Sequence, residues 1–152
     1  MSSVKESVLP RVLDEGYGGG AWHGPDMKTA LAEVPEKLAF WRPTAGRHNI
    51  AEITAHHAYY VHSVSGQLSG TAEPFLFAGE DWFEVEKPWS KVQALIANEH
   101  GRLADVVSGI ADGRIKPSLS EDEVFKLVLG ITCHAVYHAG QVQLIRRLAD
   151  GQ

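Results

Sequence analysis

The C-terminal part of the chain carries the pattern that most restricts the fold, a long apolar stripe at helical spacing. Ser120 is a favoured N-cap residue, and Glu123 completes a capping box with it. Apolar residues then recur at roughly the 3.6-residue period of an α-helix over about residues 121–149. The stripe consists of Val124, Leu127, Val128, Ile131, Ala135, Val142, Ile145 and Leu148. Because such a face must be buried, the pattern predicts a long helix packed against other helices.

Capping signals and prolines divide the rest of the chain into further helical segments. Asn49 is a good N-cap, and Glu52 follows it at the spacing of a capping box. Pro35 interrupts an earlier helical pattern that begins near Pro25. Helices are expected, in chain order, at about residues 3–15, 25–34, 36–41, 49–68 and 89–109. No segment shows a convincing strand pattern.

These expectations define one fold class, an all-α four-helix bundle with a short extra N-terminal helix. A long loop, about residues 70–88, separates the second and third helices of the bundle. Its aromatic residues should pack back onto the helices, because so much aromatic surface is rarely left in water. They are Phe75, Phe77, Trp82 and Phe83. The 152 residues fit a single domain, 1–152.

Charge and cysteine content exclude several classes of partner. The net charge is -5 and the basic residues are scattered, so nucleic acid and anionic membrane surfaces are not expected partners. No apolar run approaches the roughly 18 residues of a membrane span. The single cysteine, Cys133, allows no internal disulfide and suits a reducing cytoplasm. Eight histidines in 152 residues are a high share and point to metal or proton chemistry.

His134 and His138 stand four residues apart on the last predicted helix. This spacing places both imidazoles on one helix face, on or beside the apolar stripe. Unpaired imidazoles inside a bundle are unfavourable, and a divalent cation is one partner that can satisfy them. Ala135 stands where the glutamate of a zinc-protease H-E-x-x-H motif would be, so that class of protease is disfavoured.

A third imidazole would have to come from the helix predicted at 49–68, which contains His56 and His57 in succession. The apolar residues of this helix centre a stripe nearer to His57, so periodicity alone slightly favours that histidine. A buried face of 100° or more can still include His56 at its edge. The pattern of residues leaves both histidines open.

Two sequence runs resemble the DinB/YfiT-like family of helical metal-binding proteins. They are HNIAEITAHHAYY and GITCHAVYHAGQVQLIRR, and the earlier stretch AWHGPDMKTALAEVPEKLAFWRP is also similar to the start of that family. The similarity extends over about residues 21–147. In this family, a histidine of the second helix and the H-x-x-x-H pair of the last helix hold a divalent ion, and water or ligand completes the coordination.

The resemblance implies that His56, His134 and His138 are the metal ligands, because the family histidine falls on His56 and the next position is usually apolar. Many relatives carry aspartate where this chain has Ala135. Some relatives are thiol-dependent S-transferases or isomerases, and many pair as homodimers. The resemblance therefore implies a small-molecule substrate or thiol and a homodimer as partners.

Three neutral imidazoles suit a divalent transition metal, Zn²⁺ or Ni²⁺ above all. An open coordination position is typical of catalytic zinc sites and favours a metal-dependent hydrolase or low-molecular-weight-thiol transferase. A non-catalytic metal-binding or stress-response module is the alternative, and a bundle with purely structural histidines is the third hypothesis. Candidates for orienting the ligands or lining the pocket are Glu52, Gln141, His48 and Tyr60. For Glu52 and Gln141, a helix cap and a solvated face are the competing interpretations.

The remaining histidines, tryptophans and Cys133 are assigned simpler roles. We expect His62 to be exposed and His23 and His100 to lie on the surface or in loops. Cys133 is expected to be a small core residue. Core or loop anchoring is expected for Trp22, Trp41, Trp82 and Trp89, and packing for Tyr137.

Overall fold

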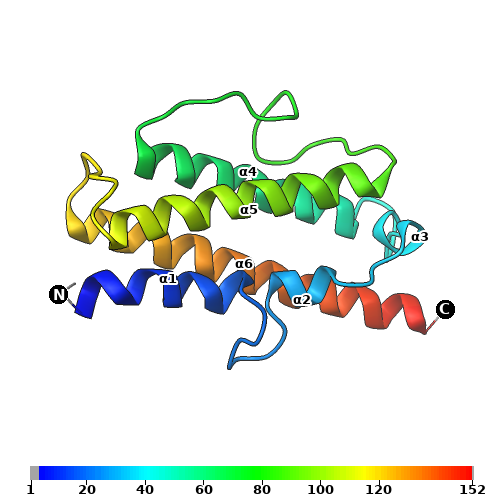
Figure 1. The fold of residues 1–152 in the computed structure, drawn as a ribbon. Coiled ribbons are helices and arrows are strands. Elements are labelled where there is room, and N and C mark those ends of the chain that lie inside the picture. Colours follow the sequence, from blue (N-terminus) through cyan, green and yellow to red (C-terminus); the bar gives the residue numbers. More distant parts are fainter. Residues whose placement is uncertain (1–3, 152) are drawn as a thin grey trace.

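The computed structural model describes the backbone of residues 4–151 and the side chains of residues 8–151. All regular structure in this part of the chain is helical, which confirms the all-α fold class. Four long helices run roughly along one direction, and two short helices lie between the first and second of them (Figure 1). The helices are α1 (Val4–Tyr17), α2 (Met27–Leu31), α3 (Glu36–Ala39), α4 (Ile50–Ser69), α5 (Trp89–Ala111) and α6 (Glu121–Asp150).

The N-terminal helix is an integral part of the bundle, although its sequence pattern presented it as an addition. Helix α1 packs against both α5 and α6, and α2 continues along α6 beyond it (Figure 1). Leu9 and Leu13 of α1 are buried. A Cβ on Gly16 would lie 3.1 Å from the Ala135 Cβ, so this glycine permits the close approach of α1 to α6.

Both predicted capping boxes are present. The Asn49 side chain accepts from the Glu52 backbone N–H, and the Glu52 carboxylate accepts from the Asn49 N–H in return. Ser120 and Glu123 make the same reciprocal pair at the start of α6. These bonds satisfy N–H groups that a helix start leaves without partners, and they fix where the two histidine-bearing helices begin.

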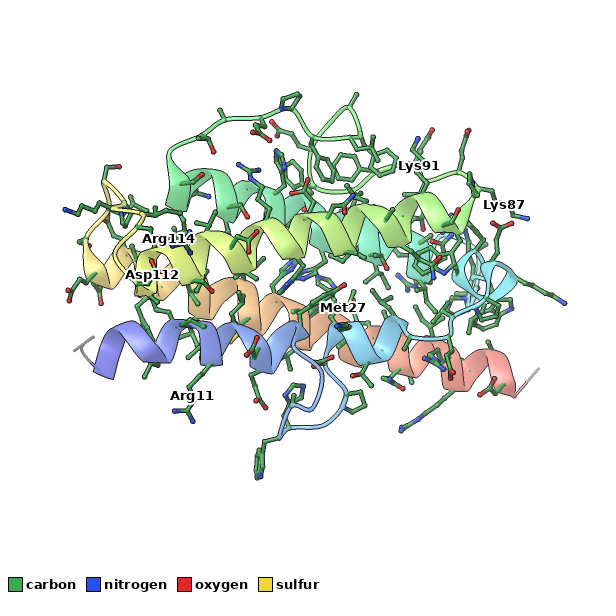
Figure 2. The ribbon with its side chains drawn as sticks, viewed as in Figure 1. Arg11, Met27, Lys87, Lys91, Asp112 and Arg114 are labelled. Carbon is green, nitrogen blue, oxygen red and sulfur yellow. The ribbon has the colours of Figure 1, made fainter. Side chains whose placement is uncertain are left out.

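The core lies where α4, α5 and α6 meet α1 and α2. Fully buried side chains include Met27 at the start of α2 (Figure 2) and Val128 and Val142 of α6. Two expectations for α6 are wrong, because Leu148 is 45% exposed and Cys133 is exposed. Both residues belong to an outer face of α6 that no other element of the described chain covers.

The segment between α4 and α5, residues 70–88, folds back on α4 through its aromatic residues, as expected. Phe83 is buried, and its ring lies 5.5 Å from that of Tyr59 on α4. Phe75 and Trp82 are half-buried beside it. Trp22, by contrast, is 94% exposed, so its predicted role as an anchor is wrong. Among the described residues, no helix combines the length and the hydropathy that crossing a membrane demands.

Candidate metal centre

Helices α4 and α6 bring three of the predicted residues together in the middle of the bundle. His56 comes from α4, and His134 and His138 come from successive turns of α6. One ring nitrogen from each residue lies within 4.8 Å of the other two. The Nε2 atoms of His134 and His138 are 3.2 Å apart. His56 and His138 are buried, and His134 is half-buried.

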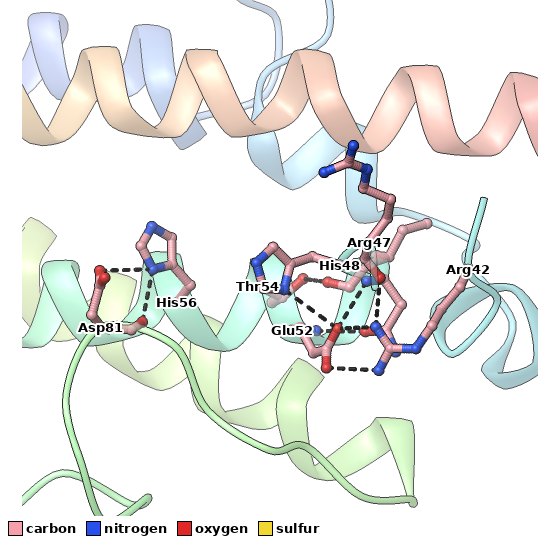
Figure 3. Close-up of polar contacts among 9 residues, drawn as sticks. Arg42, Arg47, His48, Glu52, Thr54, His56 and Asp81 are labelled. Atoms are coloured by element: carbon pink, nitrogen blue, oxygen red, sulfur yellow. Dashed lines mark hydrogen bonds and ion pairs between the residues drawn. The ribbon is translucent and has the colours of Figure 1, made fainter. Parts of the chain in front are cut away.

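The ring of His56 is oriented by the segment that follows α4. Its Nδ1 lies 2.7 Å from the Asp81 carbonyl oxygen, which can only accept, so Nδ1 carries the hydrogen. In the neutral ring, Nε2 then bears a lone pair, and Figure 3 shows this nitrogen pointing away from Asp81 toward α6. Trp82 stacks on the same ring with centroids 3.9 Å apart. The loop thus fixes both the tautomer and the plane of His56.

Gln141 orients His138 in the same way. The His138 Nδ1 lies 2.7 Å from the Gln141 side-chain oxygen, one turn further along α6. Because that oxygen accepts the hydrogen bond, the Nε2 of the neutral His138 ring also carries a lone pair. Gln141 was singled out from the sequence for this contact, and the solvated-face interpretation of its side chain is not what the structure shows.

His57, which periodicity slightly favoured over His56, stands behind the three histidines. Its Nδ1 lies 2.8 Å from the His134 Nδ1, so the two rings share one hydrogen. When His134 donates it, the Nε2 of His134 is left with a lone pair that faces His138. His57 is fully buried, and its own Nε2 has no hydrogen-bond partner. The stripe on α4 correctly indicates the burial of His57. The residue bonds to a candidate ligand, His134, and is not one of the three converging histidines.

Burial favours the unprotonated form of His57, His134 and His138 near neutral pH. Desolvation, with the nearby His138 and His56 rings adding to it, lowers the pKa of His134 from 6.5 to about 4. Burial also lowers the pKa of His138 and brings the pKa of His57 well below the ordinary value. Neutral rings at His134 and His138 each keep one nitrogen with a lone pair, which is the form that binds a cation.

This donor set fits a divalent transition-metal ion. Imidazole nitrogens about 2.0–2.1 Å from a tetrahedral ion lie roughly 3.4 Å from each other. The 3.2 Å between His134 and His138 is close to that value. The widest separation in the set, up to 4.8 Å, requires His56 and the pair to approach by about an ångström or more.

The other predicted pocket residues divide into two groups. Tyr60 donates from its hydroxyl to the Asp81 carboxylate over 2.8 Å, and His48 stacks on Trp82 with centroids 3.6 Å apart. Both therefore support the loop that holds His56. For Glu52, the structure supports the helix-cap interpretation, because its carboxylate accepts from the Asn49 N–H and no hydrogen bond joins it to the His56 ring among the described residues. Its carboxylate binds both terminal nitrogens of Arg42, at 2.6 and 2.8 Å, besides capping α4 (Figure 3).

A cavity of about 430 Å³ lies between α4 and α6 and opens beside His134. Its apolar lining comes from Val64, Leu119, Leu127 and Ile131, and Tyr60 and His134 stand at one end. A cavity of this size and lining is typical of a small-molecule site. His134, the half-buried member of the three-histidine set, therefore borders a space that a small ligand can enter.

Two other histidines are less exposed than expected. His62 is half-buried and bonds to the Glu99 carboxylate at 3.0 Å and to the Glu73 carbonyl oxygen at 2.7 Å. His100 lies within α5, where it is buried and stacks on Tyr17 with centroids 3.8 Å apart. His23 is exposed, as expected. The neighbouring residues in the sequence do not predict the burial of His62 and His100, because the side chains that contact them come from other elements.

Comparison with known proteins identifies the family of the chain. The family model of the DinB superfamily matches residues 21–142. No curated protein and no solved structure matches the chain significantly. The matched range contains α2 to α5 and most of α6, including all three histidines of the candidate metal centre. On this evidence the chain belongs to the DinB superfamily.

Proposed function

We propose that His56, His134 and His138 bind one divalent transition-metal ion, Zn²⁺ or Ni²⁺, at the centre of a metal-dependent enzyme. The reaction classes that suit this site are hydrolysis and the transfer of a low-molecular-weight thiol to an electrophile. One observation carries the proposal: carbonyl-type oxygens hold the Nδ1 atoms of His56 and His138, so the Nε2 of each neutral ring bears a lone pair suited to a cation.

The ion, when bound, supplies a Lewis acid that lowers the pKa of a coordinated water or thiol. The protein's own residues perform the other tasks. Asp81, Gln141 and His57 orient the three rings, and the cavity beside His134 holds the apolar part of a small substrate.

A non-catalytic metal-binding or stress-response module is the second candidate, and Ala135 favours it. This residue is buried next to His134 and offers no carboxylate at a place where a general base could stand. Asp81 brings a carboxylate near His56, but its Oδ1 already accepts from Tyr60. The single cysteine further supports the proposal that the protein works in a reducing compartment such as the cytoplasm.

Elemental analysis of the purified protein tests the site. We expect one equivalent of metal in the wild type and in His57→Ala, and loss of metal in His56→Ala and His138→Ala. Metal kept by His56→Ala but lost from His57→Ala would show that the ligand is the other histidine of the pair. Absence of metal from the wild type, even after incubation with Zn²⁺ or Ni²⁺, would refute the site.

Turnover assays separate the two candidate functions. The metal-loaded protein is incubated with glutathione-like thiols plus an electrophile, and separately with panels of esters and amides. Activity that is lost in His138→Ala supports the enzyme. Tight metal binding without turnover in either panel supports the non-catalytic module.

A further inference from the structure

The cavity beside His134 is a groove that follows α6 away from the candidate metal centre. Its α6 wall extends from His134 back to Glu123, about 16 Å at a rise of ~1.5 Å per residue. The part of this wall between Leu127 and His134 is roughly 10 Å long. It has no acidic or basic side chain apart from the imidazole, since residues 127–145 include no aspartate, glutamate, lysine or arginine. The groove therefore offers an apolar wall directly next to the three histidines.

The end of the groove away from His134 is polar. Glu123 and Lys126 line it from the first two turns of α6, and Gln67 lines it from α4. The Ser120 backbone N–H bonds to the Glu123 carboxylate and lowers the pKa of that carboxyl, so the group stays ionised. An alkyl chain gains little by extending beside such groups, because they remain hydrated. The change from apolar to charged lining therefore limits the length of chain that the groove can hold.

Gly130 keeps the middle of the groove open. It lies inside α6, where glycine weakens a helix relative to alanine. A Cβ at this position would meet no atom within 4 Å, and the φ of this glycine is not positive, so neither packing nor backbone conformation in the described chain requires it. Because Gly130 lines the cavity, a side chain there would take up space in the groove. Glycine at this position preserves room for a bound molecule.

We propose that the substrate of this site is a medium-chain acyl compound, with an unbranched alkyl chain of about eight carbons in the groove and its carbonyl head beside His134. The inference rests on the proposed metal-dependent function and names a substrate class for it. Carbon–carbon bonds of ~1.5 Å at an angle of ~111° advance an extended chain by about 1.25 Å per carbon, so about eight carbons span the apolar wall. At the His134 end, the imidazole and the Tyr60 hydroxyl provide the polar surroundings that suit a carbonyl head.

Calorimetric titration of the Zn²⁺-loaded full chain with alkyl hydroxamates of increasing length tests the proposal. The hydroxamate head chelates metal ions, so acetohydroxamate reports on the ion and the longer members report on the groove. The affinity should rise about twofold per methylene, roughly 60-fold from two carbons to eight, because the open side of the groove leaves part of each methylene in water. Decanohydroxamate should bind within about twofold of octanohydroxamate, since its last carbons reach the charged end of the groove.

Two glycine substitutions on α6 test the place of the alkyl chain. Gly130→Leu fills the groove and should reduce the affinity for octanohydroxamate to about that for acetohydroxamate, which itself should stay within about twofold of the wild-type value. Gly140→Leu is the matched control, because an added Cβ there also meets no atom within 4 Å, and Gly140 is not among the described residues that line the groove. It should leave the affinities of the whole series unchanged. Circular dichroism of both variants verifies that the fold is intact.

The outcomes separate a failure of this inference from a failure of the metal site. Acetohydroxamate that binds as tightly as octanohydroxamate would overturn the substrate class and leave the metal site standing. Equal losses of octanohydroxamate affinity in Gly130→Leu and Gly140→Leu would also overturn it, because the effect would then not come from the groove. If no hydroxamate binds and elemental analysis finds no metal in the protein, the proposed metal site is refuted and this inference with it.

Discussion

Two regions of α4 each contain a buried or half-buried histidine, His62 in one and His56 in the other. The two residues differ in the partners of their ring nitrogens. His62 has an oxygen acceptor at each nitrogen, the Glu99 carboxylate and the Glu73 carbonyl. His56 has one such acceptor, the Asp81 carbonyl, and its other nitrogen faces the imidazoles of α6. Burial alone therefore does not distinguish a structural histidine from a candidate ligand. The distinction lies in whether a lone pair is left over after the protein's own hydrogen bonds are made.

The most direct test replaces one candidate ligand, His138, and one structural histidine, His62, with alanine. His138→Ala removes a converging nitrogen, so we expect the affinity for Zn²⁺ to fall on the order of 1,000-fold, beyond the 10- to 100-fold typical of supporting residues. His62→Ala removes a ring whose nitrogens are both occupied, so the affinity should stay within about twofold while the protein loses roughly 1–2 kcal/mol of stability. Isothermal titration with a competing chelator measures the affinity, and urea unfolding measures the stability.

Equal losses of Zn²⁺ affinity in His138→Ala and His62→Ala would mean that an available lone pair does not distinguish a ligand from a structural histidine. Retention of affinity in His138→Ala would exclude this residue as a ligand. The variant His62→Ala also serves as the control for general effects of removing a half-buried ring.

The pH dependence of the stability tests the burial of two histidines, His134 and His100. The pKa of His134 and the pKa of His100 are each lowered to about 4 in the folded protein by burial, against 6.5 in the unfolded chain. Between these values the unfolded chain binds more protons, so the stability of the metal-free protein falls as the pH decreases from about 6.5 to about 4. For His100 the loss is at most about 3 kcal/mol, and it is smaller for His134 because part of that ring faces solvent.

Urea unfolding of the metal-free protein at several pH values measures this loss. His100→Gln should flatten the profile over the same window without changing the affinity for Zn²⁺. A profile that is level between pH 7 and pH 4 would contradict the lowered pKa values. Saturating Zn²⁺ should steepen the profile, since protonation of the rings then also releases the metal.

The fold was largely predictable from the sequence because its signals are local. Capping boxes at Asn49 and Ser120 and the apolar period of α6 depend only on neighbouring residues, and the helices begin where these signals place them. Leu148 and Cys133 were misplaced for the opposite reason. Apolar character predicts burial, but on α6 it extends round the helix, and only the tertiary arrangement shows which side the rest of the chain covers.

The sequence predicted which histidines form the candidate site, but it did not predict all of the contacts that orient them. The spacing of His134 and His138 is a local property of one helix, and Gln141 follows at the next turn. The contact between His56 and Asp81 joins residues 25 positions apart through a loop of irregular backbone, which no periodicity describes. The partner of Glu52 proved to be Arg42, because an arginine from the preceding loop competes for that carboxylate.

The smallest effect is expected from substitution of His57, which shares features of both a structural histidine and a residue of the candidate site. It is fully buried like a structural histidine, yet it bonds to His134 and leaves its own Nε2 without a partner. His57→Leu removes the group that orients His134, so the affinity for Zn²⁺ should fall about 10- to 100-fold. The same substitution removes a buried nitrogen that lacks a hydrogen bond but also the bond to His134, and because these two effects offset each other the stability of the metal-free protein should change by less than about 1 kcal/mol. A merely structural residue predicts the reverse pattern, lower stability with unchanged affinity, and measuring both quantities on one variant decides between the two roles.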